Sequence, residues 1–247
     1  MMKFETQSVS IYIKSEKLSG TLFVPQSKNQ NLLPSVVIFH GRGSNKKRYF
    51  DRAQSLAEKG FLTLVFDFRG CGESDGKFSN QTIAKGFEDA LAGYDFLVSH
   101  KLCDKNQIGV LGGSFGGYQA ALLTEKRPVS SLILAAPAIY QDEWWNAVPE
   151  KMDPERKALY RQQADIRNTK AIKVIKKYSG QILIVEHEND EVIPKRITKV
   201  YYENTINSSL REKQIIKEAP HALHDQKYLT QSSEIITSWF LKTLTNK

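Results

Sequence analysis

The hydrophobic residues of this chain fall into short blocks separated by longer, mostly polar segments. Eight blocks are rich in β-branched, aliphatic and aromatic residues, and the middle four or five are nearly continuous apolar runs. Such runs are typical of strands buried on both faces of a parallel sheet. We predict strands at residues 4–13, 18–25, 35–41, 61–68, 107–113, 131–138, 181–188 and 211–219. The first two predict an antiparallel hairpin at the start of the chain.

Between these blocks, apolar positions recur at three- and four-residue spacing, which predicts helices. The clearest case places Ile83, Phe87, Leu91, Tyr94 and Val98 on one side of a helix. We predict helices at residues 47–59, 82–100, 115–127 and 225–244. Strands that alternate with helices in this way predict an α/β fold: a doubly wound, mostly parallel eight-stranded sheet flanked by helices.

One interval, residues 139–179, contains no strand pattern. We interpret it as a small helical cap inserted after the sixth strand of a single domain spanning residues 1–247, since no linker or repeat divides the chain. The cap carries four large side chains: Tyr140, Trp144, Trp145 and Met152. They either line an apolar substrate pocket or pin the cap to the sheet, and the sequence leaves both interpretations open.

The positive charge of the chain raises nucleic-acid binding as a further possible function. A formal net charge of +8 is compatible with nucleic-acid binding, but the basic residues are scattered among acidic ones and match no known nucleic-acid-binding signature. No apolar run approaches the ~18 residues of a membrane span, the first residues lack a signal-peptide pattern, and two cysteines are too few for a disulfide framework. We therefore predict a cytoplasmic protein with no nucleic-acid or membrane partner.

The chemistry of the sequence centres on Ser114. Residues 112–116 read GGSFG, which matches the motif G-x-S-x-G between a predicted strand and a predicted helix. In that context the serine sits in a strained turn, and glycines on both sides let strand and helix approach closely. The amide of Phe115 then starts the helix and points toward an oxyanion that develops beside Ser114.

Three motifs together resemble the α/β-hydrolase superfamily, and the resemblance covers nearly the whole chain. Residues 40–43 (HGRG) look like the family's oxyanion segment, residues 66–76 (FDFRGCGESDG) like its D-x-R-G-x-G-x-S turn, and residues 112–117 like its nucleophile elbow. The resemblance implies that the amides of Arg42 and Phe115 hold the oxyanion. Length and cap resemble small feruloyl- or cinnamoyl-type carboxylesterases, whereas the elbow is similar to that of prolyl-oligopeptidase-type domains.

A serine nucleophile needs a base and a carboxylate that orients it, and in this fold the chain order is Ser, acid, His. The resemblance assigns the acid to Asp190, after the seventh strand, although His187 stands where the family usually has Gly. It assigns the base to His221 in preference to His224, which lies closer to the last helix. His221, His224 and the adjacent Asp225 lack a distant further ligand, so we expect neither a metal nor a cofactor.

These expectations add up to a serine hydrolase that cleaves small acyl or aryl carboxylic esters through an acyl-enzyme. The partner is then a small-molecule acyl substrate, and a homodimer stays open. Peptidase-like or acyl-thioesterase activity is the alternative on the same fold. A second alternative is a binding protein that has lost catalysis, although Ser114, Asp190 and His221 are all present.

Overall fold

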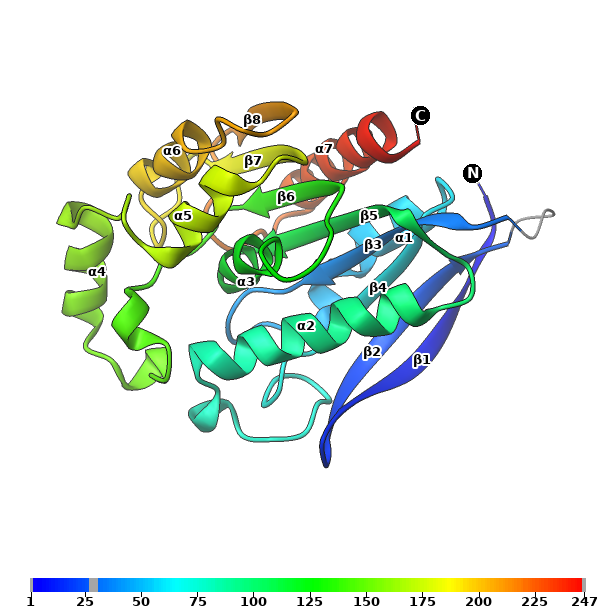
Figure 1. Ribbon diagram of the computed structural model, residues 1–247, viewed down its shortest axis with the longest axis horizontal. Coiled ribbons are helices and arrows are strands. Elements are labelled where there is room, and N and C mark those ends of the chain that lie inside the picture. The colour runs from blue at the N-terminus through cyan, green and yellow to red at the C-terminus, as the bar shows by residue number, and fades with distance from the viewer. Residues whose placement is uncertain (1, 27–30, 246–247) are drawn as a thin grey trace.

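A computed structural model describes residues 2–26 and 31–245, and it is built on one eight-stranded sheet (Figure 1). The strands lie in the order β1-β2-β4-β3-β5-β6-β7-β8. Their bounds are β1 Phe4–Ile13, β2 Glu16–Pro25, β3 Leu33–Phe39, β4 Leu62–Phe66, β5 Cys103–Gly113, β6 Ser131–Ala135, β7 Gln181–His187 and β8 Leu210–Ile216. β1, β2 and β4 pair antiparallel, and the pairs from β4 through β3 to β8 are parallel. The predicted eight-stranded, mostly parallel sheet is confirmed.

The central strands are buried on both faces, as their apolar runs predict. Every residue of β4 is buried, and so are the last five residues of β3. In the second half of the hairpin strand β1, the buried or partly buried Val9, Ile11 and Ile13 alternate with exposed residues, because only one face of the strand meets the core. Since β3, β5, β6, β7 and β8 run in the same direction, the loops that follow them meet at one edge of the sheet.

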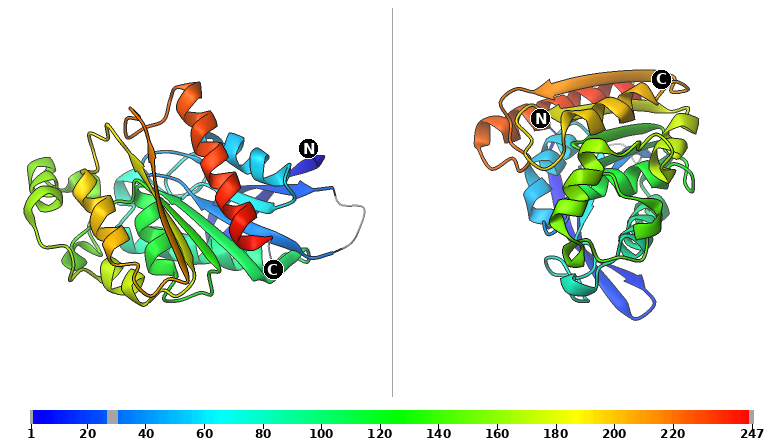
Figure 2. Two further views of the ribbon diagram at one scale, coloured as in Figure 1. Left: turned by 90° about the horizontal axis from the view of Figure 1, so that it is seen from above. Right: turned by 90° about the vertical axis from the view of Figure 1, so that its left-hand side faces the viewer.

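Helices cover both faces of the sheet (Figure 2). The α-helices are α1 Phe50–Ala57, α2 Ile83–Ser99, α3 Phe115–Leu123, α4 Pro154–Gln163, α5 Lys170–Lys177, α6 Lys195–Glu203 and α7 Gln226–Leu244. The short 3-10 helices are η1 Lys46–Tyr49, η2 Phe78–Asn80, η3 Asp142–Trp144 and η4 Pro149–Lys151. α1 and α7 share one apolar core with one face of the sheet, and α2, α3, α5 and α6 share a second core with the other face.

The interval between β6 and β7 holds η3, η4, α4 and α5, and no strand. η3, η4 and α4 lie beyond the end of the sheet (Figure 1), where the amide of Ala84 donates to the carbonyl of Trp145. α5 packs instead against α3 and buries its apolar residues, among them Ile172 and Ile175. The part of residues 139–179 that projects as a cap therefore ends before α5. The single-domain organisation stays a prediction.

The turn after β4 is held by buried ion pairs. Asp67 accepts a hydrogen bond from Lys46 Nζ at 2.7 Å, and both side chains are at most 4% exposed. Arg69 donates to the carboxylates of Asp89 (2.5 Å), Glu88 (2.7 Å) and Glu16 (3.0 Å). These bonds join the turn to the β1–β2 hairpin and to α2, so they fix the loop that packs beside the end of β3.

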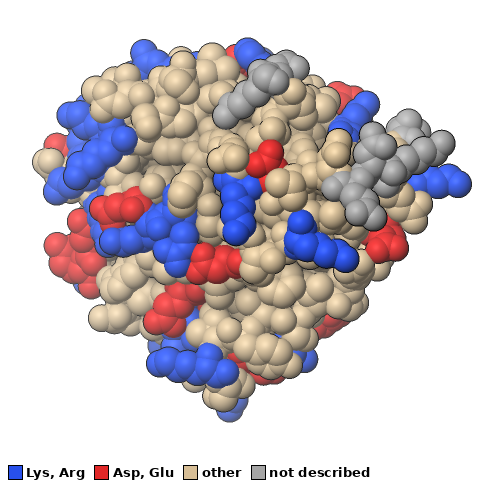
Figure 3. All heavy atoms as spheres, turned by 45° about the vertical axis from the view of Figure 1, so that its right-hand side comes forward, with Lys and Arg blue, Asp and Glu red and all other residues tan. Residues whose placement is uncertain are grey.

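The surface carries charges of both signs. On the face shown in Figure 3, basic and acidic side chains lie next to one another. Among the helices of residues 2–26 and 31–245, none is long and apolar enough to cross a membrane.

Candidate active site

Ser114 lies in the turn between β5 and α3 with an unusual backbone. Its φ is 49° and its ψ is −111°, a conformation that L-residues adopt only under strain of about 1–3 kcal/mol. The turn is held by the Ser114 amide, which donates to Ala135 O at 2.9 Å, and by the Ser114 carbonyl, which accepts from Tyr118 at 3.1 Å and from Ala138 at 2.9 Å. These bonds to β6, to α3 and to the segment after β6 fix the strained geometry.

The glycines on both sides of Ser114 allow this turn to form. A Cβ on Gly112 would overlap the carbonyl of Gly116, and a Cβ on Gly116 would overlap the carbonyl oxygen of Phe39. Both obstacles are backbone, which cannot rotate away. The ends of β3 and β5 and the start of α3 therefore meet at a distance that only glycine permits.

The structure brings His221 and Asp190 to Ser114. His221 Nε2 lies 3.1 Å from Ser114 Oγ, and His221 Nδ1 lies 2.7 Å from Asp190 Oδ2. The Asp190 side chain is 3% exposed, and its other oxygen accepts from the amides of Val192 (2.8 Å) and Ile193 (2.7 Å). Since the carboxylate can only accept, His221 donates from Nδ1 and presents Nε2 as an acceptor to the serine hydroxyl.

His187 supports the loop that carries His221. Its Nδ1 lies 3.1 Å from the carbonyl oxygen of Pro220 and 3.2 Å from that of His221, so Nδ1 carries the proton and donates to them. Burial lowers its pKa, which favours the neutral form of the ring. His187, which stands where the family usually has Gly, therefore holds the loop of His221 by a contact that a Gly could not make. No sequence pattern beyond the residue type itself predicts this contact.

The other two histidines near the site do not contact Ser114. Arg48 Nη1 donates to His224 Nδ1 at 2.8 Å, at the surface. His40 is buried and joins two loops, because its Nε2 accepts from the Phe68 amide at 3.0 Å and its Nδ1 donates to Gly41 O at 2.6 Å. Burial lowers the pKa of His40 to about 4.

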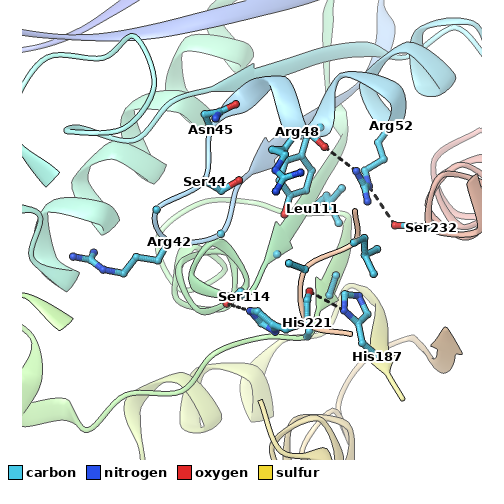
Figure 4. Close-up of a pocket in the computed structure, with 18 of the residues that line it drawn as sticks. Arg42, Ser44, Asn45, Arg48, Arg52, Leu111, Ser114, His187, His221 and Ser232 are labelled. Carbon is cyan, nitrogen blue, oxygen red and sulfur yellow. Dashed lines mark hydrogen bonds between the residues drawn. The ribbon is translucent and has the colours of Figure 1, made fainter. Parts of the chain in front are cut away.

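The predicted oxyanion donors lie on two sides of Ser114. Phe115 is the first residue of α3, so its amide has no partner within the helix. Arg42 belongs to the loop whose Gly41 packs against Ser114, with 3.5 Å between the Ser114 Cβ and an added Cβ on Gly41. The Arg42 side chain points away (Figure 4) and donates to Glu150 in the cap and to Gln81. This ties the loop that carries the Arg42 amide to the cap.

A cavity of about 410 Å³ opens beside Ser114 (Figure 4). It is lined by residues 41–45, by the segment that carries Arg48 and Arg52, and by Ser232 and Ile236 of α7. Ser114, His187 and His221 line the same cavity. It therefore lies between α1, α7 and the edge of the sheet, and its volume is typical of small-molecule sites.

The four large residues of the cap do not line this cavity. Tyr140 packs edge-on against Phe115 and Tyr118, with ring centroids 6.2 Å and 5.0 Å apart. Trp144 and Trp145 pack edge-on against Tyr160 and Phe87, respectively, and Met152 packs against the same core. Of the two interpretations of these residues, the contacts favour the one in which they pin the cap.

Residues 30–165 match a family model described as "Serine aminopeptidase, S33". Among curated proteins, an uncharacterized protein of Mycobacterium tuberculosis is 26% identical over 166 residues, which are 67% of this chain and 56% of the relative. Protein bem46 of Schizosaccharomyces pombe is 23% identical and covers 77% of this chain and 62% of its own length. This chain thus spans little more than half the length of the M. tuberculosis relative.

Solved structures share the whole fold. A structure of Est1E from Butyrivibrio proteoclasticus with bound ferulic acid has a TM-score of 0.74 and 22% identity, over 96% of this chain and 100% of that one. The Pyrococcus furiosus esterase Pf2001 has a TM-score of 0.72 and 22% identity, over 98% and 94%. The Pyrococcus horikoshii acylaminoacyl peptidase has a TM-score of 0.75 and 18% identity, over 100% of this chain and 43% of the peptidase.

Proposed function

We propose that this chain, which belongs to the serine aminopeptidase S33 family of α/β hydrolases, is a serine hydrolase that cleaves small carboxylic esters. The observation that carries the proposal is the continuous hydrogen-bond path from Asp190 through His221 to Ser114. A serine hydroxyl is a weak nucleophile at neutral pH, and a base oriented by a carboxylate is the arrangement that activates it.

The proposed reaction uses the three side chains in turn. His221 Nε2 takes the proton from Ser114 Oγ as this oxygen attacks the ester carbonyl, and the amides of Arg42 and Phe115 stabilise the oxyanion. His221 then protonates the departing alcohol oxygen, which leaves an acyl group on Ser114. A water molecule, deprotonated by His221, releases the acid and restores the serine. Asp190 holds Nδ1–H of His221 throughout and stabilises the imidazolium.

The preference for esters is the finer part of the proposal. The cavity beside Ser114 has room for a small acyl or aryl group. Neighbours in fold are named as an esterase and as a complex with ferulic acid, which supports ester chemistry. A peptidase-like activity is the second candidate, because the matching family is described as an aminopeptidase family and one neighbour in fold is an acylaminoacyl peptidase. A cytoplasmic location stays a prediction.

The test compares Ser114→Ala with Ser99→Ala, an exposed serine at the end of α2. Removing the nucleophile of such a triad lowers kcat by about 10⁴-fold or more. We expect wild type and Ser99→Ala to hydrolyse p-nitrophenyl esters and to react with a fluorophosphonate probe, and Ser114→Ala to do neither. Hydrolysis of aminoacyl arylamides without hydrolysis of esters would contradict the ester preference and support the peptidase-like activity instead. Retained activity in Ser114→Ala would refute it.

A further inference from the structure

The cavity beside Ser114 has a cationic wall. Arg48 and Arg52, four residues apart at the junction of η1 and α1, both line it, and Figure 4 places them across the cavity from Ser114 and His221. Among the described residues that line the cavity, none is Asp or Glu. Arg42 lines the cavity as well, but its guanidinium points away and donates to Glu150. Ser114 thus shares its cavity with the guanidinium groups of Arg48 and Arg52 and with no carboxylate.

Arg52 is buried without an anionic partner. The residue is 5% exposed, its Nε donates to Ser232 Oγ at 3.2 Å, and its Nη1 donates to the carbonyl of Arg48 at 2.9 Å. Its guanidinium also lies over the ring of Tyr49, 5.1 Å from the centroid. Within residues 2–26 and 31–245 no carboxylate forms an ion pair with it and its Nη2 has no hydrogen-bond partner. Asp51, its neighbour on α1, is exposed and lies outside the cavity lining.

A buried charge without a counter-ion is unusual. Buried charged groups are normally paired, because desolvation penalises the charged form by several kcal/mol. An arginine stays protonated under these conditions, so it cannot avoid the penalty by losing its proton. The bonds to Ser232 and to a backbone carbonyl orient the guanidinium, and neither partner carries a negative charge. An anion that enters the cavity would supply the missing counter-charge.

The remainder of the lining indicates what carries that anion. Leu111, Leu223 and Ile236 line the same cavity and provide apolar surface. A methylene chain matches such surface, and a carboxylate at its end matches the planar fork of an arginine, which binds carboxylates through two hydrogen bonds. The 410 Å³ of the cavity suffices for a short chain of this kind.

We propose that this cavity binds the free carboxylate of the substrate's acyl chain, so that the preferred substrates are half-esters of short dicarboxylic acids. Arg52 binds the carboxylate and Arg48 adds positive charge beside it, while Ser114 attacks the ester at the other end of the chain. This inference rests on the proposed function, because it names the acyl group that the same site accepts.

The kinetic test compares an anionic and a neutral ester of similar length. We would measure kcat/KM for the p-nitrophenyl monoester of adipic acid and for p-nitrophenyl hexanoate, in wild type and in Arg52→Met. Arg167→Met, which removes an exposed arginine outside the cavity, controls for net charge. The ratio of the two kcat/KM values should favour the adipate ester in wild type and in Arg167→Met, and should fall at least tenfold in Arg52→Met. An unchanged ratio in Arg52→Met would overturn the proposal.

Arg48→Gln provides a second variant if Arg52→Met does not fold, because Arg48 is exposed and its removal leaves the buried core intact. The same ratio should fall severalfold in Arg48→Gln. If the ratio of the two kcat/KM values in Arg48→Gln equals that of wild type, the positive charge of the cavity wall is not the source of the preference for the anionic ester.

A binding experiment separates this inference from the proposed function. Calorimetry of Ser114→Ala with adipate, inorganic phosphate and neutral adipamide measures the anion site without turnover. We expect adipate to bind, adipamide not to bind, and Arg52→Met in the same background to weaken adipate binding at least tenfold. If phosphate binds and adipate does not, the site recognises a phosphate group and not a carboxylate, and the proposed substrate class is refuted. If adipate binds but the wild type hydrolyses no ester, the proposed function fails and the anion site stands.

Discussion

Two buried arginines in this protein have nearly equal exposure and opposite surroundings. Arg69 is 6% exposed in the turn after β4, and three carboxylates accept hydrogen bonds from it. Arg52 is 5% exposed in the wall of the cavity, where its partners are a hydroxyl and a carbonyl. The first arginine joins the β1–β2 hairpin, the turn and α2, and its charge is compensated within the fold. The second keeps a charge that forms no ion pair within residues 2–26 and 31–245.

The difference indicates which buried cation serves structure and which serves binding. A paired buried charge contributes mainly by avoiding the penalty that would follow if its partner were left alone. An unpaired one destabilises the protein unless a ligand neutralises it, and proteins retain such features at functional sites. The same substitution at both positions should therefore have different consequences.

The largest effect is expected when Arg69 is replaced by Met. Asp89, which is fully buried, would lose its cationic partner, and breaking a buried pair in this way costs about 3–5 kcal/mol. Arg52→Met leaves no buried charge behind: it removes two hydrogen bonds to neutral groups, but it also removes the desolvation penalty of an unpaired guanidinium, so we expect a loss of at most about 1 kcal/mol. Urea unfolding of the two variants measures both values. Equal losses would show that the contrast between the two arginines does not reflect charge pairing.

The next effect concerns His40, which joins the two regions by bonding to Phe68 in the turn and to Gly41 in the cavity loop. Burial lowers its pKa from 6.5 to about 4 in the folded protein. Between pH 6.5 and pH 4 the His40 ring binds a proton in the unfolded chain but not in the folded protein. The free energy of unfolding therefore falls as the pH falls, by about 3 kcal/mol at most. Below about pH 4 both states are protonated and this contribution is fully lost.

Urea unfolding between pH 7 and pH 4 measures this loss, and His40→Gln serves as the comparison. Gln can accept from the Phe68 amide but does not titrate, so the variant should lose less stability over the same interval. Direct NMR titration of the His40 ring should give a pKa near 4. A His40 pKa near 6.5 would contradict the prediction, because it would mean that water reaches the ring that joins the turn to the cavity loop.

The smallest effect is expected for Glu73, the exposed carboxylate among the ion pairs of the turn after β4. Glu73 bonds to Lys46 and Lys47, and these contacts lower its pKa to about 2. Lys47→Met should raise that pKa toward 4.5 without reaching it, because Lys46 remains. NMR titration of the Glu73 carboxyl carbon measures the shift, and Lys59→Met, which changes an exposed lysine in the turn after α1, is the control. A pKa unchanged by Lys47→Met would assign the whole effect to Lys46.

The sequence predicted the sheet and the position of the elbow well, for local reasons. The strands around Ser114 are continuous apolar runs that fit a doubly buried strand, and the glycines of the elbow are required by contacts with nearby backbone. The assignments of Asp190 and His221 depended on the chain order typical of the family, and the structure places both within hydrogen-bond distance of the next member of the path. Their catalytic roles stay proposals.

The remaining features depend on contacts between distant segments. Ser232 orients Arg52 from a position 180 residues later in the chain, and no local pattern reveals that pairing. The cap residues were open to two interpretations because an apolar side chain looks the same in a sequence whether it meets a substrate or the core. α6 was not predicted as a separate helix, and α4 and α5 were merged into one cap interval, because boundaries between short polar helices carry weak signals.

The close approach at Gly112 and Gly116 has a consequence for how this protein can change over evolutionary time. At these two positions any side chain would overlap backbone, so a substitution there would displace the turn that positions Ser114. The walls of the cavity carry no such restriction, because Arg48, Leu223 and Ile236 meet open space on one side. Substitutions that change substrate preference are therefore expected in the walls of the cavity and not at the two glycines of the elbow. Variation among descendants of this sequence should concentrate in the parts of α1 and α7 that line the cavity.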